Sequence, residues 1–88
     1  MGQLRVTPEQ LLARASEYRT QGENAGVLIA NLDRLISTLE SEWEGVSASK
    51  YISSYQDLRP SFVSMQELIY DLASSLEKKA KEFVIVDQ

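Results

Sequence analysis

The feature that most constrains the fold is a long, regular line of apolar residues in the first half of the chain. They recur in alternating steps of four and three residues over positions 11–43. A mean period of about 3.5 residues places them on one side of an α-helix, as in a coiled coil. We therefore expect a helix over about residues 8–41 that carries one continuous apolar seam. The members of the seam are Leu11, Ala15, Tyr18, Gly22, Ala25, Ile29, Leu32, Ile36, Leu39 and Trp43.

The start of this helix is marked by three residues. Thr7 can accept a hydrogen bond from the backbone of the first helical turn, and Pro8 suits the first helical position because its missing N–H costs nothing there. Gln10 lies three residues after Thr7 and completes the capping-box pattern. The sequence therefore predicts a helix that begins directly after Thr7.

The second half of the chain carries a similar line, which predicts a second helix over about residues 47–83. Pro60 lies inside it, but the spacing continues on both sides, so we expect a kink rather than a break. The β-branched run after Glu82 favours a frayed tail over residues 84–88. The members of this line are Tyr51, Tyr55, Leu58, Phe62, Met65, Ile69, Leu72, Leu76 and Phe83, with Lys79 as its polar member.

Two helices joined by a short segment make an all-α antiparallel hairpin, and we expect residues 1–88 to form one such domain. The turn falls over residues 42–46, where Gly45 lets the chain reverse. Trp43 is the last seam residue before it. We expect its indole to cover the end of the hairpin and its N–H to reach a free carbonyl at a helix end.

A single hairpin of this size is marginally stable, because two helices bury only one seam. We expect two hairpins to pair into a four-helix bundle. Gly22 and Gly26 lie one helical turn apart and have two interpretations: a tolerated weak point in the helix, or a waist at which two protomers cross. The apolar residues that flank the seams and supply the second surface are Leu12, Leu28, Leu35, Ile52 and Leu68.

Composition excludes several function classes. The chain has no cysteine and no histidine, which removes disulfides, thiolate nucleophiles, imidazole bases and the usual zinc ligands. Its net charge of −4 argues against nucleic acid as a partner. Glu40, Glu42 and Glu44 crowd the turn without the glycine spacing of a calcium loop, so a solvated acidic rim is expected there. We expect no enzyme activity, no metal and no cofactor.

The Trp43-Glu44-Gly45 triplet between two heptad helices resembles the WXG family, the early-secreted-antigen-like substrates of type VII secretion. The resemblance covers nearly the whole chain. It implies a helical-hairpin dimer, usually antiparallel, that passes from the cytoplasm to the outside in folded form without a cleaved signal peptide. It also implies recognition by a secretion ATPase. The family's signal after the second helix, Tyr-x-x-x-Asp/Glu, is matched in spacing by Phe83 and Asp87, with Phe in place of Tyr.

Several alternatives remain open from the sequence. The dimer can be a homodimer or a heterodimer with a related chain. Phe83 can simply close the seam, with Asp87 a solvated charge. A cytosolic coiled-coil adaptor that binds partner helices has the same seams. A membrane-acting amphipathic hairpin is a further possibility, because a dissociated hairpin exposes an apolar face.

Overall fold

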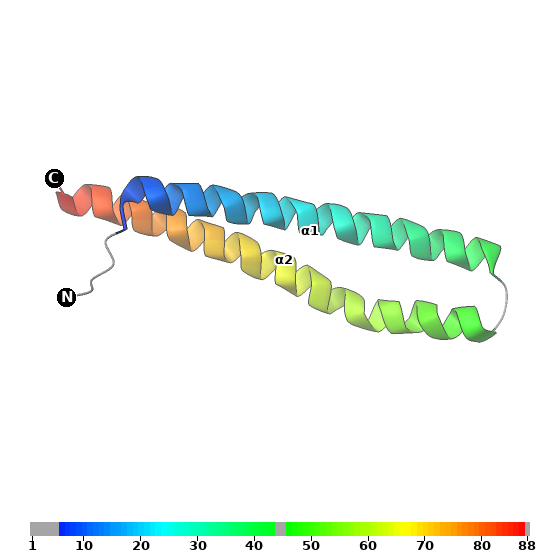
Figure 1. The fold of residues 1–88 in the computed structure, drawn as a ribbon. Helices are drawn as coiled ribbons and strands as arrows, with labels where there is room; N and C mark the ends of the chain where they lie inside the picture. Colours follow the sequence, from blue (N-terminus) through cyan, green and yellow to red (C-terminus); the bar gives the residue numbers. More distant parts are fainter. Residues whose placement is uncertain (1–5, 44–45, 88) are drawn as a thin grey trace.

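The computed structural model describes the backbone of residues 6–43 and 46–87 and the side chains of residues 6–43 and 48–83. It contains two helices, α1 (Pro8–Glu42) and α2 (Val46–Asp87), and no strand in the described ranges. They run antiparallel beside each other as a rod of 65 × 22 × 17 Å (Figure 1). The all-α hairpin expected from the two apolar lines is thus confirmed. Gly45 lies outside the described residues.

The N-terminus of α1 carries the capping box that the sequence predicts. The Thr7 backbone N–H donates to the Gln10 side chain over 2.9 Å, and the Gln10 backbone N–H donates to the Thr7 hydroxyl over 3.1 Å. Two free N–H groups are satisfied in this way. Pro8 occupies the first position of the helix, where it breaks no hydrogen bond.

Helix α2 continues through Pro60 and past Phe83. Pro60 lies inside one uninterrupted helix, and the ribbon bends in the yellow-green segment around residue 60 (Figure 1). The backbone is helical up to Asp87, so α2 ends four residues later than the predicted end at about residue 83. A helix that already exists gains a residue at little cost, and a β-branched residue opposes this by only a few tenths of a kcal/mol.

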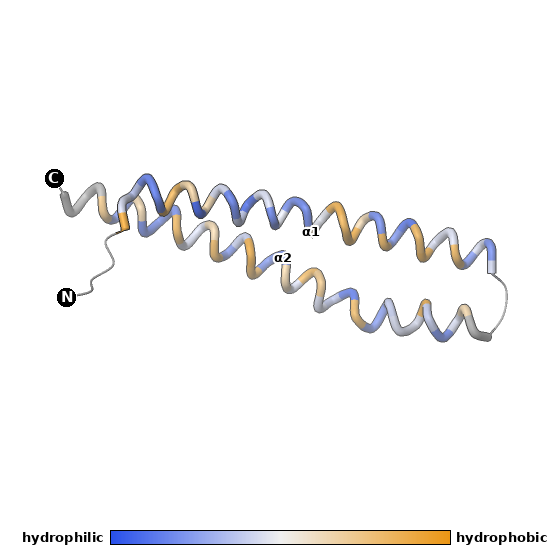
Figure 2. The backbone as a smooth tube through the Cα atoms, in the orientation of Figure 1, coloured by the Kyte–Doolittle hydropathy of each residue, from blue (hydrophilic) through white to orange (hydrophobic). Residues whose placement is uncertain are grey.

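The core of the hairpin consists mainly of small residues. Among the described side chains, no large one falls below 2 % exposure. Small residues let two helix backbones approach closely, but they bury little apolar area. Hydrophobic residues recur along the whole length of both helices (Figure 2), and twelve large ones among the described side chains are at least 39 % exposed. The buried residues are Ala15, Gly22, Ala25, Ile29, Ala48, Ala73 and Ala80.

The line of α2 that faces α1 differs from the one read from the sequence. Five of the nine apolar members of the expected line lie toward α1 and are half-buried, namely Tyr55, Phe62, Ile69, Leu76 and Phe83. The other four members, Tyr51, Leu58, Met65 and Leu72, are 40–61 % exposed. The positions that α1 covers instead are Ala48, Ile52, Gln66, Ala73 and Ala80, whereas Arg59 of the same heptad line stays exposed and reaches Asp33 with its guanidinium. The sequence of α2 therefore carries two adjacent apolar lines, and the spacing of four and three residues includes members of both.

The two glycines of α1 lie against α2 within the same chain. A Cβ atom on Gly22 would come within 2.5 Å of the Tyr70 ring. On Gly26 it would meet the Gln66 amide nitrogen at 2.6 Å, and this amide donates to the Gly22 carbonyl over 3.0 Å. Tyr70 thus fills the space that the missing side chain of Gly22 leaves. The glycines have an intrachain role that neither sequence interpretation included.

This packing predicts opposite tolerance at the two glycines. Gly22→Ala meets a rigid ring, and the overpacking exceeds the gain in helix propensity, so we expect the free energy of unfolding to fall by about 1 kcal/mol. Gly26→Ala meets only the tip of a flexible side chain and is expected to stay within about 0.5 kcal/mol of wild type. Urea unfolding followed by circular dichroism at one protein concentration compares them. Equal stability of the two variants would contradict the packing.

Candidate interaction site

One flank of the hairpin is polar and tied by ion pairs between the helices. Asp33 on α1 accepts hydrogen bonds from Arg59 through both carboxylate oxygens, each over 2.8 Å, and from the Tyr55 hydroxyl over 2.6 Å. The guanidinium of Arg59, followed by the Tyr55 hydroxyl, lowers the pKa of Asp33 from 3.8 to about 2. The bond to Asp33 in turn raises the pKa of Tyr55.

A second ion pair lies nearer the open end of the hairpin, on the same flank. Arg19 donates to both carboxylate oxygens of Glu77 over 2.7 Å and to the Ser74 hydroxyl over 3.1 Å. The guanidinium holds the pKa of Glu77 below its ordinary value. Because Arg19, Gly26 and Asp33 are spaced by seven residues, they share one side of α1. The charged groups of these two ion pairs on this flank therefore have their partners within one chain.

The opposite flank is apolar and open. A groove of about 150 Å³ lies between the helices near the middle of the rod, and its lining is almost wholly apolar. Leu28 is 55 % exposed and Met65 is 45 % exposed at this groove. Such a lining, without polar partners, suits another apolar helix. The residues that line it are Ala25, Leu28, Ile29, Leu32, Phe62 and Met65.

The turn end of the hairpin presents two aromatic rings. Trp43 is the C-cap of α1, and its backbone N–H donates to the Leu39 carbonyl over 2.9 Å. Its indole stacks on Tyr51 of α2, with ring centroids 6.4 Å apart and planes 24° from parallel. Trp43 is 45 % exposed and Tyr51 is 61 % exposed. The carbonyls of residues 44 and 45, at which the indole N–H was expected to find a partner, lie outside the described residues.

The other candidate signal lies at the opposite end of the rod. Phe83 is half-buried, and the Lys79 ammonium lies 5.9 Å from its ring centroid. The side chain of Asp87 lies outside the described residues. In Figure 1 the turn and the C-terminus mark the two far ends of the hairpin. Trp43 and Phe83 therefore do not meet within one chain.

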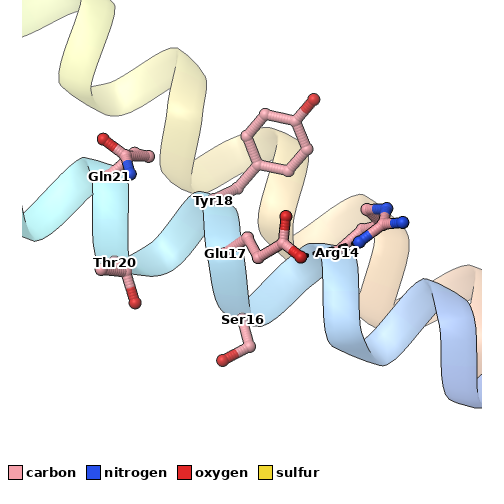
Figure 3. A pocket seen from close by; sticks show the side chains of 6 residues that line it. All are labelled: Arg14, Ser16, Glu17, Tyr18, Thr20 and Gln21. Carbon is pink, nitrogen blue, oxygen red and sulfur yellow. Dashed lines mark hydrogen bonds and ion pairs between the residues drawn. The ribbon is translucent and has the colours of Figure 1, made fainter.

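A shallow hollow of about 410 Å³ lies on α1 near the open end. All of its lining comes from this one helix, and Tyr18 and Gln21 project from the opposite side to Ser16 and Thr20 (Figure 3). Arg14 and Glu17 form an exposed ion pair over 2.7 Å at its edge. Side chains from a single helix do not enclose a small ligand, so this hollow is a surface feature of the open end.

Neither helix is long and apolar enough over its described residues to cross a membrane. In the same residues, no group of three or more acidic, cysteine or histidine side chains is placed to hold a metal ion. Glu44, one of the three turn carboxylates, is outside this range. The features that stand out are therefore the apolar flank and the two ends of the rod.

Comparison with known proteins identifies the fold and the turn motif together. A family described as proteins of 100 residues with WXG, or WXG100, matches residues 3–88. The chain belongs to the WXG100 family. Its Trp43-Glu44-Gly45 triplet is the motif of the family's name, and the resemblance drawn from the sequence is confirmed.

Relatives of this WXG100 chain match it over almost their full length. The protein YukE of Bacillus subtilis is 37 % identical over 99 % of this chain and 90 % of its own. The solved structure of EsxA from Geobacillus thermodenitrificans superposes with a TM-score of 0.91 at 39 % identity, over 100 % of this chain and 95 % of that one. The type VII secretion system extracellular protein A of Staphylococcus aureus is 22 % identical over 100 % of this chain and 91 % of its own.

Sequence reasoning missed the polar flank of this WXG100 hairpin. Arg59 and Gln66 stand at seam positions of α2, and a search for apolar residues passes over them. The sequence feature that could have indicated the contact line of α2 is the seven-residue spacing of Ala73 and Ala80, combined with the glycines of α1. Small residues at heptad spacing on both helices indicate where two backbones approach.

The Asp33 ion pair predicts acid sensitivity. Because the pKa of Asp33 is lower in the folded chain than in the unfolded one, its contribution is present above about pH 4 and is lost as the pH falls toward 2. We expect Asp33→Asn to flatten the fall of the thermal midpoint between pH 4 and pH 2. Asp71→Asn, which removes an exposed carboxylate of α2, is the control and keeps the wild-type slope. A wild-type slope for Asp33→Asn would contradict the assignment.

Proposed function

We propose that this WXG100 protein is a small, non-enzymatic substrate of a type VII secretion system, exported as a folded helical dimer. Membership of the family and a full-length relative named as a type VII extracellular protein support the secreted role. The open apolar flank supports pairing, because exposed leucines and a methionine beside a groove are costly to leave in water. The partner is a second copy of the chain or a related hairpin.

The two ends of the rod supply the recognition surface. The exposed Trp43 and Tyr51 lie at the turn, and Phe83 lies near the other end of the rod, which is 65 Å long. An antiparallel second hairpin brings the turn of one chain to the α2 end of the other. Trp43, Gly45, Phe83 and Asp87 then form one composite surface that exists only in the assembled pair. A secretion ATPase that reads this surface selects dimers from the cytoplasm.

A second candidate function is that of an adaptor whose groove binds an apolar helix of another protein. The observation that favours it is the same apolar groove between α1 and α2. The two functions differ in where the protein is found. An adaptor stays in the cell and copurifies with its partner, whereas a secreted substrate accumulates in the medium with an N-terminus that intact-mass measurement shows to be uncleaved.

Export of variants tests the composite surface. We expect Trp43→Ala and Asp87→Ala to reduce the amount in the culture medium at least severalfold while the intracellular protein stays folded. Circular dichroism and sedimentation of each purified variant check folding and assembly. The matched controls are Val27→Ala, which removes another exposed apolar side chain of α1, and Asp57→Ala, which removes an exposed carboxylate of α2. Normal export of both test variants would overturn the proposed signal.

A further inference from the structure

The direction of α2 changes at Pro60. This residue has no N–H to donate to the carbonyl of Gln56, and its ring crowds that carbonyl, which kinks a helix. In Figure 1, α2 moves away from α1 between its C-terminal part and residue 60, and beyond the bend it runs alongside α1 to the turn. A straight α2 would continue away from α1. The bend therefore redirects residues 46–59, which we call the turn-side arm.

The turn-side arm is held to α1 by little buried apolar surface. Among the described side chains on this side of the bend, only Ala48 is buried. The larger residues between the helices there remain partly exposed, so apolar contacts alone leave the arm less constrained than the open half. The half-buried residues on this side are Leu32, Ile36, Leu39, Ile52 and Tyr55.

Polar contacts hold the arm at the bend itself. Within the described residues, every hydrogen bond between the turn-side arm and α1 ends on Asp33. Arg59, the residue before Pro60, donates to both of its carboxylate oxygens over 2.8 Å, and Tyr55 donates over 2.6 Å. A bidentate arginine–carboxylate pair has a defined geometry. The Tyr55 ring also lies 6.3 Å from the ring of Phe62, beyond the proline.

The other end of the arm carries Tyr51, whose ring stacks on Trp43 with centroids 6.4 Å apart. The bend lies nine residues away, or about 13 Å along the helix. A change of about 20° in the bend therefore moves Tyr51 by about 5 Å, which is enough to separate two rings that stack at this distance. The place of Tyr51 against the indole thus depends on the angle of α2 at Pro60.

We propose that Asp33 is a positioning residue for the aromatic pair at the turn: it fixes the bend of α2 and thereby holds Tyr51 against Trp43. It acts through Arg59 and Tyr55, because about 15 Å of helix separates it from the indole. The inference rests on the proposed role of Trp43 in recognition, and it identifies the residue that determines how the turn is presented.

A purely stabilising role for Asp33 is the alternative, and the chain contains a matched comparison. The pair of Arg19 and Glu77 also joins the two helices through two hydrogen bonds on the same flank. Its side chains are 42 % and 34 % exposed, against 44 % and 38 % for Arg59 and Asp33. The pairs differ in position, since only that of Asp33 lies at the bend. Loss of either pair destabilises the hairpin, but only loss of the Asp33 pair is expected to change the turn.

Fluorescence quenching tests this difference, because Trp43 is the one tryptophan of the chain. With acrylamide and the purified full chain, we expect Asp33→Ala to raise the quenching constant most of the way to that of Tyr51→Ala, which lacks the stacked ring. Glu77→Ala keeps the wild-type constant. Asp33→Arg combined with Arg59→Asp restores an ion pair and is expected to return the constant toward wild type. An unchanged constant in Asp33→Ala, an equal rise in Glu77→Ala, or no return in the exchanged pair would overturn the proposal.

Pro60→Ala tests the bend. Proline is the least favourable residue inside a helix and alanine the most favourable, so we expect a thermal midpoint at or above that of wild type. The quenching constant of Trp43 is nevertheless expected to rise, because a straighter α2 takes Tyr51 away from the indole. Ser61→Ala, at the exposed neighbouring position, is the control for helix propensity. A wild-type quenching constant in Pro60→Ala would contradict the role of the bend.

Export separates this inference from the proposed function. We expect Asp33→Ala to lower the amount in the culture medium severalfold and Glu77→Ala to leave it unchanged. Sedimentation is expected to show wild-type assembly for both, because they lie on the flank opposite the apolar groove. If Trp43→Ala is not exported but Asp33→Ala is, the turn signal stands and the positioning role is wrong. Normal export of Trp43→Ala overturns the signal, and the quenching constants still decide the role of Asp33.

Discussion

The close approach of α1 and α2 through small residues is the constraint on which the rest of the structure depends. Gly22 makes room for the Tyr70 ring, and the buried alanines of α2 bring its backbone toward α1. Close contact aligns the helices, so that Asp33 meets Arg59 and Arg19 meets Glu77 on one flank. This close packing leaves most of the large apolar side chains out of the intrachain core, because small residues occupy it.

This division of the surface explains why a chain without a substantial core carries so much leucine, isoleucine and methionine. The polar flank satisfies its charges within the hairpin, and its exposed ion pairs contribute specificity of register more than stability. On the apolar flank, Leu28 and Met65 line a groove between the helices and remain 55 % and 45 % exposed. The pairing proposed above would therefore also stabilise the fold, since covering that flank removes apolar surface from water.

Much of the fold follows from sequence, and the reasons are local. The capping box at Thr7 and the heptad spacing depend on nearby residues, so they predict α1 and the hairpin correctly. The end of α2 was predicted too early. The β-branched residues at 84–86 lower the helix propensity, but extending a helix that already exists costs less than starting one. The partner line of α2 was also missed, because Arg59 and Gln66 are polar and Ala73 is small. Their places depend on the opposite helix, which no local pattern contains.

By itself the sequence determined that the chain forms two amphipathic helices, where the first one starts, and that a Trp-x-Gly turn joins them. Only the tertiary structure decided which of two adjacent lines on α2 faces α1. The physical reason is steric: without Cβ atoms at Gly22 and Gly26, α1 accepts Tyr70 and Gln66. In this packing Met65 and Leu72 of α2 remain 45 % and 40 % exposed.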